Sequence, residues 1–187
     1  MKRRYAVITA ILIISHFSLC AKSSEDEAFP QNSSSRQEKA AVTWHNFNEG
    51  IRQAREKRRP VVMDFYADWC GWCKKMEADV FSSAHVASKL NDNYICIRVY
   101  MDKDPNETIR YKNHTLSKQE FTAMLGIQGL PTIVFMDRDA DLITKIPGYI
   151  SKKVFLSLLG YIDEECYIKK ISFNDYVEGK TPCGKKK

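Results

Sequence analysis

The stretch FYADWCGWCKKM, residues 65–76, places Cys70 and Cys73 with two residues between them, and a tryptophan, Trp69 or Trp72, directly precedes each cysteine. It continues the short apolar run VVMDFYA, residues 61–67, whose β-branched and aromatic side chains are typical of a buried strand. Residues 70–90 predict a helix with a break near its middle. A strand that leads into a helix through a closely spaced cysteine pair is the feature from which the rest of the chain is interpreted.

Helical and extended patterns alternate on both sides of this stretch. Phe47, Ile51 and Ala54 recur at helical spacing and predict a first helix that ends before Pro60. Further segments follow: strands at 94–101, 132–137 and 142–148, helices at 119–125 and 151–162, and a polar, turn-like region at 106–117. This order predicts an α/β domain with a central mixed β-sheet flanked by helices.

The length of 187 residues, 44% of them apolar, is enough for one domain with extensions. We expect a signal peptide at residues 1–21, because three basic residues precede a short apolar run; an uncleaved membrane anchor is the alternative. Residues 22–42 are polar and predict a flexible linker. The folded domain is then expected at 43–162, followed by a C-terminal extension at 163–187 whose structure the pattern does not predict.

The formal net charge of +6 argues for no particular partner. Loss of the expected signal removes three basic residues and no acidic ones, which leaves +3. A nucleic-acid-binding protein would need a clustered basic surface and a matching motif, and neither is visible. We expect a monomer that does not bind nucleic acid.

Six cysteines are compatible with disulfide chemistry in an exported protein. If Cys20 leaves with the signal, five remain, so at least one thiol besides the Cys70/Cys73 pair is free or bonds to another molecule. Cys96 lies in an apolar run and is expected to be an inert buried thiol. For Cys166 and Cys183, a disulfide that holds the extension and two unpaired thiols both remain open.

The Cys70/Cys73 pair could bind zinc, staple the fold or exchange electrons. A zinc site needs more ligands than one C-x-x-C pair supplies, and a disulfide across two residues closes too small a loop to add much stability. A cysteine at the start of a helix lies near unpaired backbone N–H groups and the positive end of the helix dipole, which lowers its thiol pKa. Thiol–disulfide exchange is therefore the favoured interpretation.

The run VVMDFYADWCGWCK, residues 61–74, resembles the active-site region of the thioredoxin-like family, and GLPT, residues 129–132, resembles its cis-proline loop. The pattern is most similar to the C-terminal domain of the bacterial transmembrane reductase DsbD and to small periplasmic thiol reductases such as chlamydial DsbH. The resemblance covers residues 43–162. It implies a thioredoxin fold whose redox-active disulfide joins Cys70 to Cys73, with no other cofactor and no metal.

The resemblance also implies roles for individual residues. Cys70 matches the attacking thiolate and Cys73 the resolving thiol. Asp64 matches a buried acid with a raised pKa that handles the proton of the resolving cysteine, and an ordinary strand-end Asp facing water is the alternative. Glu77 matches a second acid of the DsbD-like branch, with a solvated helix residue as the alternative. Arg98 falls where relatives carry a lysine, and it could pair with Asp64 or lie exposed on its strand.

The expected substrate-binding residues surround the cysteines. Pro131 matches the cis-proline, which would present the backbone of Leu130 to a bound substrate strand. Trp69 and Trp72, with Gly71 between the cysteines, are expected to form a rim on which a partner docks. Core packing is the alternative for the tryptophans.

The direction of electron flow is predicted from the residues near the cysteines. Strong oxidants stabilise their reduced thiolate, and neither Gly71 nor Trp72 supplies a charge for this, so a disulfide reductase is the first hypothesis. Its expected partners are disulfide-bearing exported proteins and a membrane electron donor of the DsbD type, in the periplasm or otherwise outside the cytoplasm. An oxidase or isomerase, and a non-catalytic binding module or copper carrier, are the alternatives.

The helix after the cysteines departs from the thioredoxin pattern. Ala78 replaces a proline of thioredoxin, which predicts a less kinked helix.

Overall fold

The computed structural model describes residues 41–180 and 183–184. The expected signal at 1–21 and the expected linker up to residue 40 lie outside these residues. Among the described helices, none combines the length and the apolar character that a membrane crossing requires.

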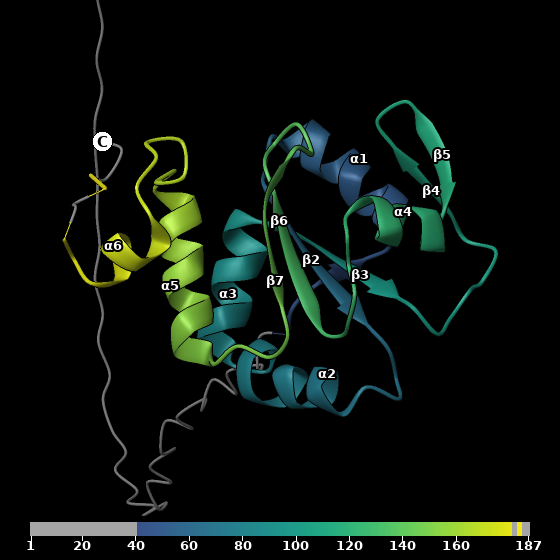
Figure 1. Cartoon of the computed structure of the whole chain (residues 1–187), viewed down its shortest axis with the longest axis horizontal. Helices are drawn as coiled ribbons and strands as arrows, with labels where there is room; N and C mark the ends of the chain where they lie inside the picture. Colours follow the sequence, from purple (N-terminus) through teal and green to yellow (C-terminus); the bar gives the residue numbers. More distant parts are fainter. Residues whose placement is uncertain (1–40, 181–182, 185–187) are drawn as a thin grey trace, which may run out of the picture. The chain divides into compact units, whose positions relative to one another are not determined.

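A five-stranded mixed sheet forms the centre of the domain (Figure 1). Its strands follow the order β1 (Trp44–His45), β3 (Ile95–Tyr100), β2 (Val61–Tyr66), β6 (Thr132–Met136) and β7 (Leu142–Pro147). The first three strands are mutually parallel, whereas β6 runs antiparallel to both β2 and β7. The predicted fold class is confirmed; the short strand β1 was not predicted.

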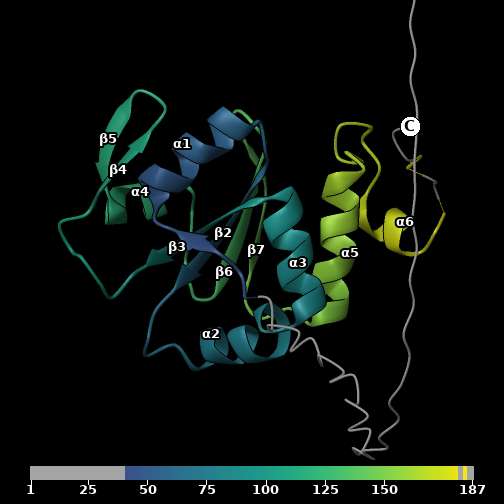
Figure 2. The same cartoon turned by 180° about the vertical axis from the view of Figure 1, so that it is seen from behind.

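Helices cover both faces of the sheet (Figures 1 and 2). Helices α1 (Phe47–Lys57) and α4 (Lys118–Met124) pack on one face, and α3 (Ala84–Asn93) and α5 (Lys152–Asp163) pack on the other. Strand β2 serves both layers because its successive side chains alternate between faces: Met63 belongs to the first core cluster and Val62 to the second. Asp64 therefore projects to the same face as Val62.

The helical region after β2 is irregular. Helix α2 (Gly71–Met76) passes into a π-helical turn, η1 (Glu77–Phe81), before α3 begins. The break near residues 82–83 is confirmed, but the replacement of proline by Ala78 does not produce a regular helix. Val80 and Phe81 are buried, and the π turn leaves Glu77 at its start beside the sheet.

The prediction that residues 106–117 are turn-like is wrong. They contain the hairpin of β4 (Thr108–Tyr111) and β5 (His114–Ser117). The alternation of β4 buries Ile109 and Tyr111 in the core beside α1 and α4, and Lys112 adopts a positive φ of 53° at the tight turn. Burial of two of its four side chains stabilises β4. Polar residues surround these two, so the alternation of apolar and polar residues is hard to see in the sequence.

The C-terminal extension packs on α5 and includes the short helix α6 (Phe173–Val177), next to α5 in Figure 1. The ring of Tyr161 on α5 contacts both Phe173 and Tyr176. A disulfide joins Cys166 to Cys183, which answers the question left open for these two cysteines. Cys96 is free and buried, as predicted.

Candidate active site

Cys70 and Cys73 form a disulfide where α2 begins. Cys70 is the N-cap residue, and the backbone N–H of Cys73 donates to its Sγ over 3.1 Å. An N-cap side chain normally accepts such a bond because the first N–H groups of a helix lack backbone partners. The strand-to-helix junction thus places a donor against the sulfur. The exposed fractions of the residues are only 5% for Cys70 and 2% for Cys73.

The loop before β6 is brought against this disulfide. Leu130 packs against the cluster of Ala67, Cys70 and Cys73, and the peptide bond between Leu130 and Pro131 is cis. The carbonyl of Pro131 accepts a hydrogen bond of 2.8 Å from the N–H of Gly148, which follows β7. The sheet pairing of β2 with β6 ends at Thr132, so Leu130 lies beyond the ladder.

The two tryptophans are exposed beside the cysteines. The exposed fraction is 73% for Trp69 and 59% for Trp72, which excludes core packing for both. The Trp72 ring lies 5.7 Å from that of Tyr149, and the Tyr149 hydroxyl donates to Asp79 over 2.9 Å. At Gly71 an added Cβ would meet no atom within 4 Å beyond its chain neighbours, so the space at this position is open. The docking role of these residues remains a prediction.

Asp64 is a buried acid on β2, the strand that leads into the cysteine pair. It is 2% exposed, and its Oδ2 accepts a bond of 2.9 Å from Nε of Arg98. Its Oδ1 is buried without a hydrogen-bond partner among the described residues. Burial raises the pKa of Asp64 to about 6, although the Arg98 guanidinium acts in the opposite direction.

Arg98 joins Asp64 to Glu77. Its Nη2 donates to Oε2 of Glu77 over 2.5 Å, and the Glu77 side chain is 41% exposed, so this acid reaches solvent. The pairing predicted for Arg98 is confirmed, and its exposed alternative is excluded by a side-chain exposure of 8%. One cation is therefore shared by two carboxylates.

Aromatic rings hold the Arg98 guanidinium, and the sequence interpretation missed this role. The group lies 4.1 Å from the ring centroid of Trp44 and 4.8 Å from that of Tyr66. Tyr66 also packs against the Cys70/Cys73 cluster, so it connects the charged group to the disulfide. Met101 packs against the same cluster. The signal available in the sequence was a spacing. Arg98 follows Cys96 by two residues on one strand, so both side chains lie on the same face of the sheet.

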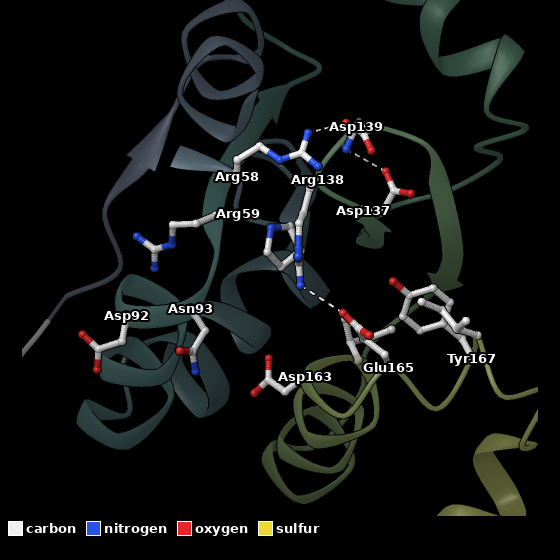
Figure 3. Close-up of a pocket in the computed structure, with 13 residues that line it drawn as sticks. Arg58, Arg59, Asp92, Asn93, Asp137, Arg138, Asp139, Asp163, Glu165 and Tyr167 are labelled. Carbon is white, nitrogen blue, oxygen red and sulfur yellow. Dashed lines mark hydrogen bonds and ion pairs between the residues drawn. The ribbon is translucent and has the colours of Figure 1, made fainter. Parts of the chain in front are cut away.

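A separate polar cavity of about 640 Å³ lies at the opposite end of β2 (Figure 3). Pro60, just before β2, lines it, whereas the cysteines follow the other end of the strand. Two of its three arginines form ion pairs, Arg58 with Asp139 and Arg138 with Glu165, and Arg59 donates to the carbonyl of Asn91. This cavity takes no part in the arrangement around Cys70.

Within the described part of the chain, one group of side chains could offer three metal ligands. These are Glu164, Cys166 and Cys183, whose ligand atoms lie within 4.8 Å of one another. The two sulfurs are bonded to each other, and a metal ligand must be a thiolate. The oxidised protein therefore does not fit a metal there.

Comparison with known proteins agrees with this geometry. The thioredoxin-like domain family matches residues 47–163. DsbD of Photorhabdus laumondii subsp. laumondii, a thiol:disulfide interchange protein, is 29% identical over 114 residues, which are 60% of this chain and 18% of DsbD. The chain therefore spans less than a fifth of that relative.

Two solved structures share the fold at low sequence identity. A thioredoxin-fold protein from Helicobacter pylori aligns with a TM-score of 0.56 and 19% identity, over 76% of this chain and 88% of that one. The structure titled DsbH oxidoreductase aligns with a TM-score of 0.50 and 19% identity, over 76% and 96%.

Proposed function

The chain belongs to the thioredoxin-like domain family, and we propose that it is an exported thiol:disulfide reductase that works through Cys70 and Cys73. The observation that supports this most is the position of their disulfide at the start of α2, against Leu130 and next in the chain to two exposed tryptophans. A bond of this kind is placed for exchange with a partner rather than for bracing the fold.

The proposed reaction begins with the reduced pair. The Cys70 thiolate attacks one sulfur of a substrate disulfide, which forms a mixed disulfide and releases the other substrate sulfur as a thiolate. Cys73 then loses its proton and attacks Sγ of Cys70, so the second substrate thiolate leaves and the Cys70–Cys73 disulfide forms. The substrate gains two electrons and the enzyme loses two.

Asp64 is proposed as the acceptor of the Cys73 proton. Its Oδ1 has no hydrogen-bond partner among the described residues, and its pKa of about 6 suits proton exchange near neutrality. Glu77 is proposed to act through Arg98, which it shares with Asp64.

The reducing direction is supported by the charges. A strong oxidant needs a stabilised thiolate in its reduced form. Here one backbone N–H reaches the Cys70 sulfur, and the adjoining charged group has two acids and one base. Unbalanced negative charge disfavours a thiolate and therefore favours release of electrons.

The protein is proposed to work outside the cytoplasm. In a bacterium with two membranes, this compartment is the periplasm. Disulfide-bearing exported proteins would be the substrates. Because exported space lacks the cytosolic reductant, a membrane electron donor of the DsbD type would regenerate the reduced pair. The sequence likeness to the thiol:disulfide interchange protein DsbD supports this assignment.

Reduction of insulin disulfides by the reduced protein tests the proposal. We expect the wild-type protein to reduce insulin and Cys70→Ser to be inactive. We expect Cys73→Ser to accumulate a mixed disulfide with the substrate. The reduction potential against glutathione tests the direction: a potential near about −120 mV would identify an oxidase instead. Insulin reduction that survives Cys70→Ser would refute the proposed role of the pair.

A further inference from the structure

Lys118, the first residue of α4, is a buried lysine that the proposed mechanism does not use. Its side chain is 1% exposed. The ammonium donates to the carbonyl of Tyr100 over 2.6 Å and to the carbonyl of Lys103, and it lies 3.1 Å from Oε2 of Glu107. The three N–H donors of a lysine thus have three acceptors. All of them belong to the end of β3 and the loop that follows it.

This loop, residues 101–107, leads directly to the candidate active site. Met101 packs against the Cys70/Cys73 cluster. In the sequence it lies between Tyr100 and Lys103, whose carbonyls Lys118 binds. Asp102 accepts a bond of 2.6 Å from the N–H of Asp68. The loop therefore reaches the chain immediately before Trp69.

Lys103 adds a second connection to the same place. Its ammonium forms an ion pair of 2.9 Å with Asp68 and lies 4.1 Å from the Tyr100 ring centroid. Thr122, one turn after Lys118 on α4, donates to the sulfur of Met101 over 3.7 Å. Loop 101–107 thus contacts the site through Met101 and Asp102, and α4 through Lys118 and Thr122.

We propose that Lys118 is a positioning residue that holds loop 101–107 as a wall of the redox site, against which a protein disulfide docks beside Trp69. The inference rests on the proposed function. Exposed pairs such as Lys103 with Asp68 hold a loop weakly, because solvent screens them. A buried ammonium with three acceptors holds it firmly, because removing the ammonium leaves two carbonyls and a carboxylate without their donor.

The position of Lys118 predicts a selective effect on catalysis. Its ammonium is bonded to Tyr100, Lys103 and Glu107 and not to a sulfur, Asp64 or Glu77, so the intrinsic reactivity of Cys70 should not depend on it directly. The wall matters only for a substrate large enough to extend past Trp69. Loss of Lys118 should therefore raise KM for a protein disulfide and spare a small one.

Lys118→Met tests this in the full chain, with insulin and 5,5′-dithiobis(2-nitrobenzoic acid) as the two substrates. We expect kcat/KM for insulin to fall about tenfold through KM, with the small reagent unaffected. Lys112→Met is the matched control, because Lys112 is an exposed, ion-paired lysine of the neighbouring hairpin. Equal loss with both substrates, or an unchanged KM for insulin, would overturn the proposal.

Two further measurements keep the test decisive. If Lys118→Met does not fold, Glu107→Gln removes one charged acceptor and should raise KM for insulin in the same selective way. Hydrogen exchange of the loop amides should speed up in Lys118→Met and not in Lys112→Met; unchanged exchange would refute the positioning role. If the wild type reduces neither substrate, the proposed function fails, and loop exchange still decides whether Lys118 holds the loop.

Discussion

Asp64 and Arg98 lie opposite each other on the parallel strands β2 and β3, joined by a hydrogen bond from Nε to Oδ2. Only one oxygen of the acid is used, and the arginine divides its donors between Asp64 and Glu77. A buried carboxyl with a single strong partner can ionise, but at a higher pH than an exposed one. The site therefore has a titrating group close to neutrality.

The pH dependence of the resolving step should follow Asp64. Below its pKa of about 6 the acid is protonated and cannot take the Cys73 proton, so the rate should fall as pH drops through that value. Single-turnover release of reduced substrate from the mixed disulfide measures this step. Asp64→Asn should abolish the inflection, and a variant that keeps it would exclude Asp64 as the proton acceptor.

The same acid should lower stability at neutral pH. Because its folded pKa is raised, the folded state holds the proton more tightly than the unfolded state, and stability is lost as pH rises from about 4 to 6. The difference between about 6 and the ordinary 3.8 corresponds to about 3 kcal/mol. Asp64→Asn should raise the free energy of unfolding at pH 7 by up to that amount and change it little at pH 4. Urea denaturation of the oxidised protein at both pH values provides the measurement.

Removal of Arg98 should have the opposite effect on stability. Arg98→Met leaves two acids without their shared cation, so the pKa of Asp64 should rise further and the free energy of unfolding should fall by about 3 kcal/mol or more. The matched control is Arg52→Met, which breaks exposed pairs with Glu49 and Glu56 and should cost under about 1 kcal/mol. If the free energy of unfolding falls by a similar amount in both variants, the buried pairs of Arg98 contribute no more to stability than the exposed pairs of Arg52.

Trp72 should contribute to the docking of protein substrates. Trp72→Ala removes an exposed ring and its contact with Tyr149, and we expect KM for insulin to rise by the equivalent of about 1–2 kcal/mol. Ile168→Ala serves as the control, because Ile168 is 61% exposed and lines the cavity at the opposite end of β2. Steady-state kinetics with insulin compares the two variants. An equal rise in KM in Trp72→Ala and Ile168→Ala would argue against a specific docking role for Trp72.

The disulfide between Cys166 and Cys183 should stabilise the extension without affecting activity. It closes a loop with a sequence separation of 17, for which the loss is about 3 kcal/mol in the chain-entropy model. Cys166→Ser with Cys183→Ser should make the region around α6 sensitive to proteolysis, while insulin reduction stays unchanged. A loss of reduction in this variant would mean that the extension supports the site.

The strand–helix junction could be predicted because it depends on local sequence, whereas the pairing of Asp64 with Arg98, 34 positions apart, was implied by the family resemblance. The run around Asp64 is apolar on both sides, which favoured burial of the acid, and Arg98 lies within an apolar strand run. The helix capped by Ser151 is likewise marked by its own residues.

Other features depend on contacts between distant segments. The hairpin of β4 and β5 is held by Asn48 of α1, whose side chain binds Thr108 and Arg110 across about 60 positions of sequence. Lys118 looks like a surface residue at a helix start, and only the loop folded over it makes it buried. Strand β1 has two residues, too few for any period to show.

Cys96 has a practical consequence for experiments on this protein. It is the one free cysteine among the described residues, and burial raises its pKa to about 12, so it should not react with alkylating reagents in the folded state. Mild reduction that opens only the pair at α2 should therefore direct the reagent to Cys70 and Cys73, with up to two labels in a chain that has lost residues 1–21 and with them Cys20. Because Cys96 should stay unlabelled, the number of labels counted by mass in that chain reports the redox state of Cys70 and Cys73.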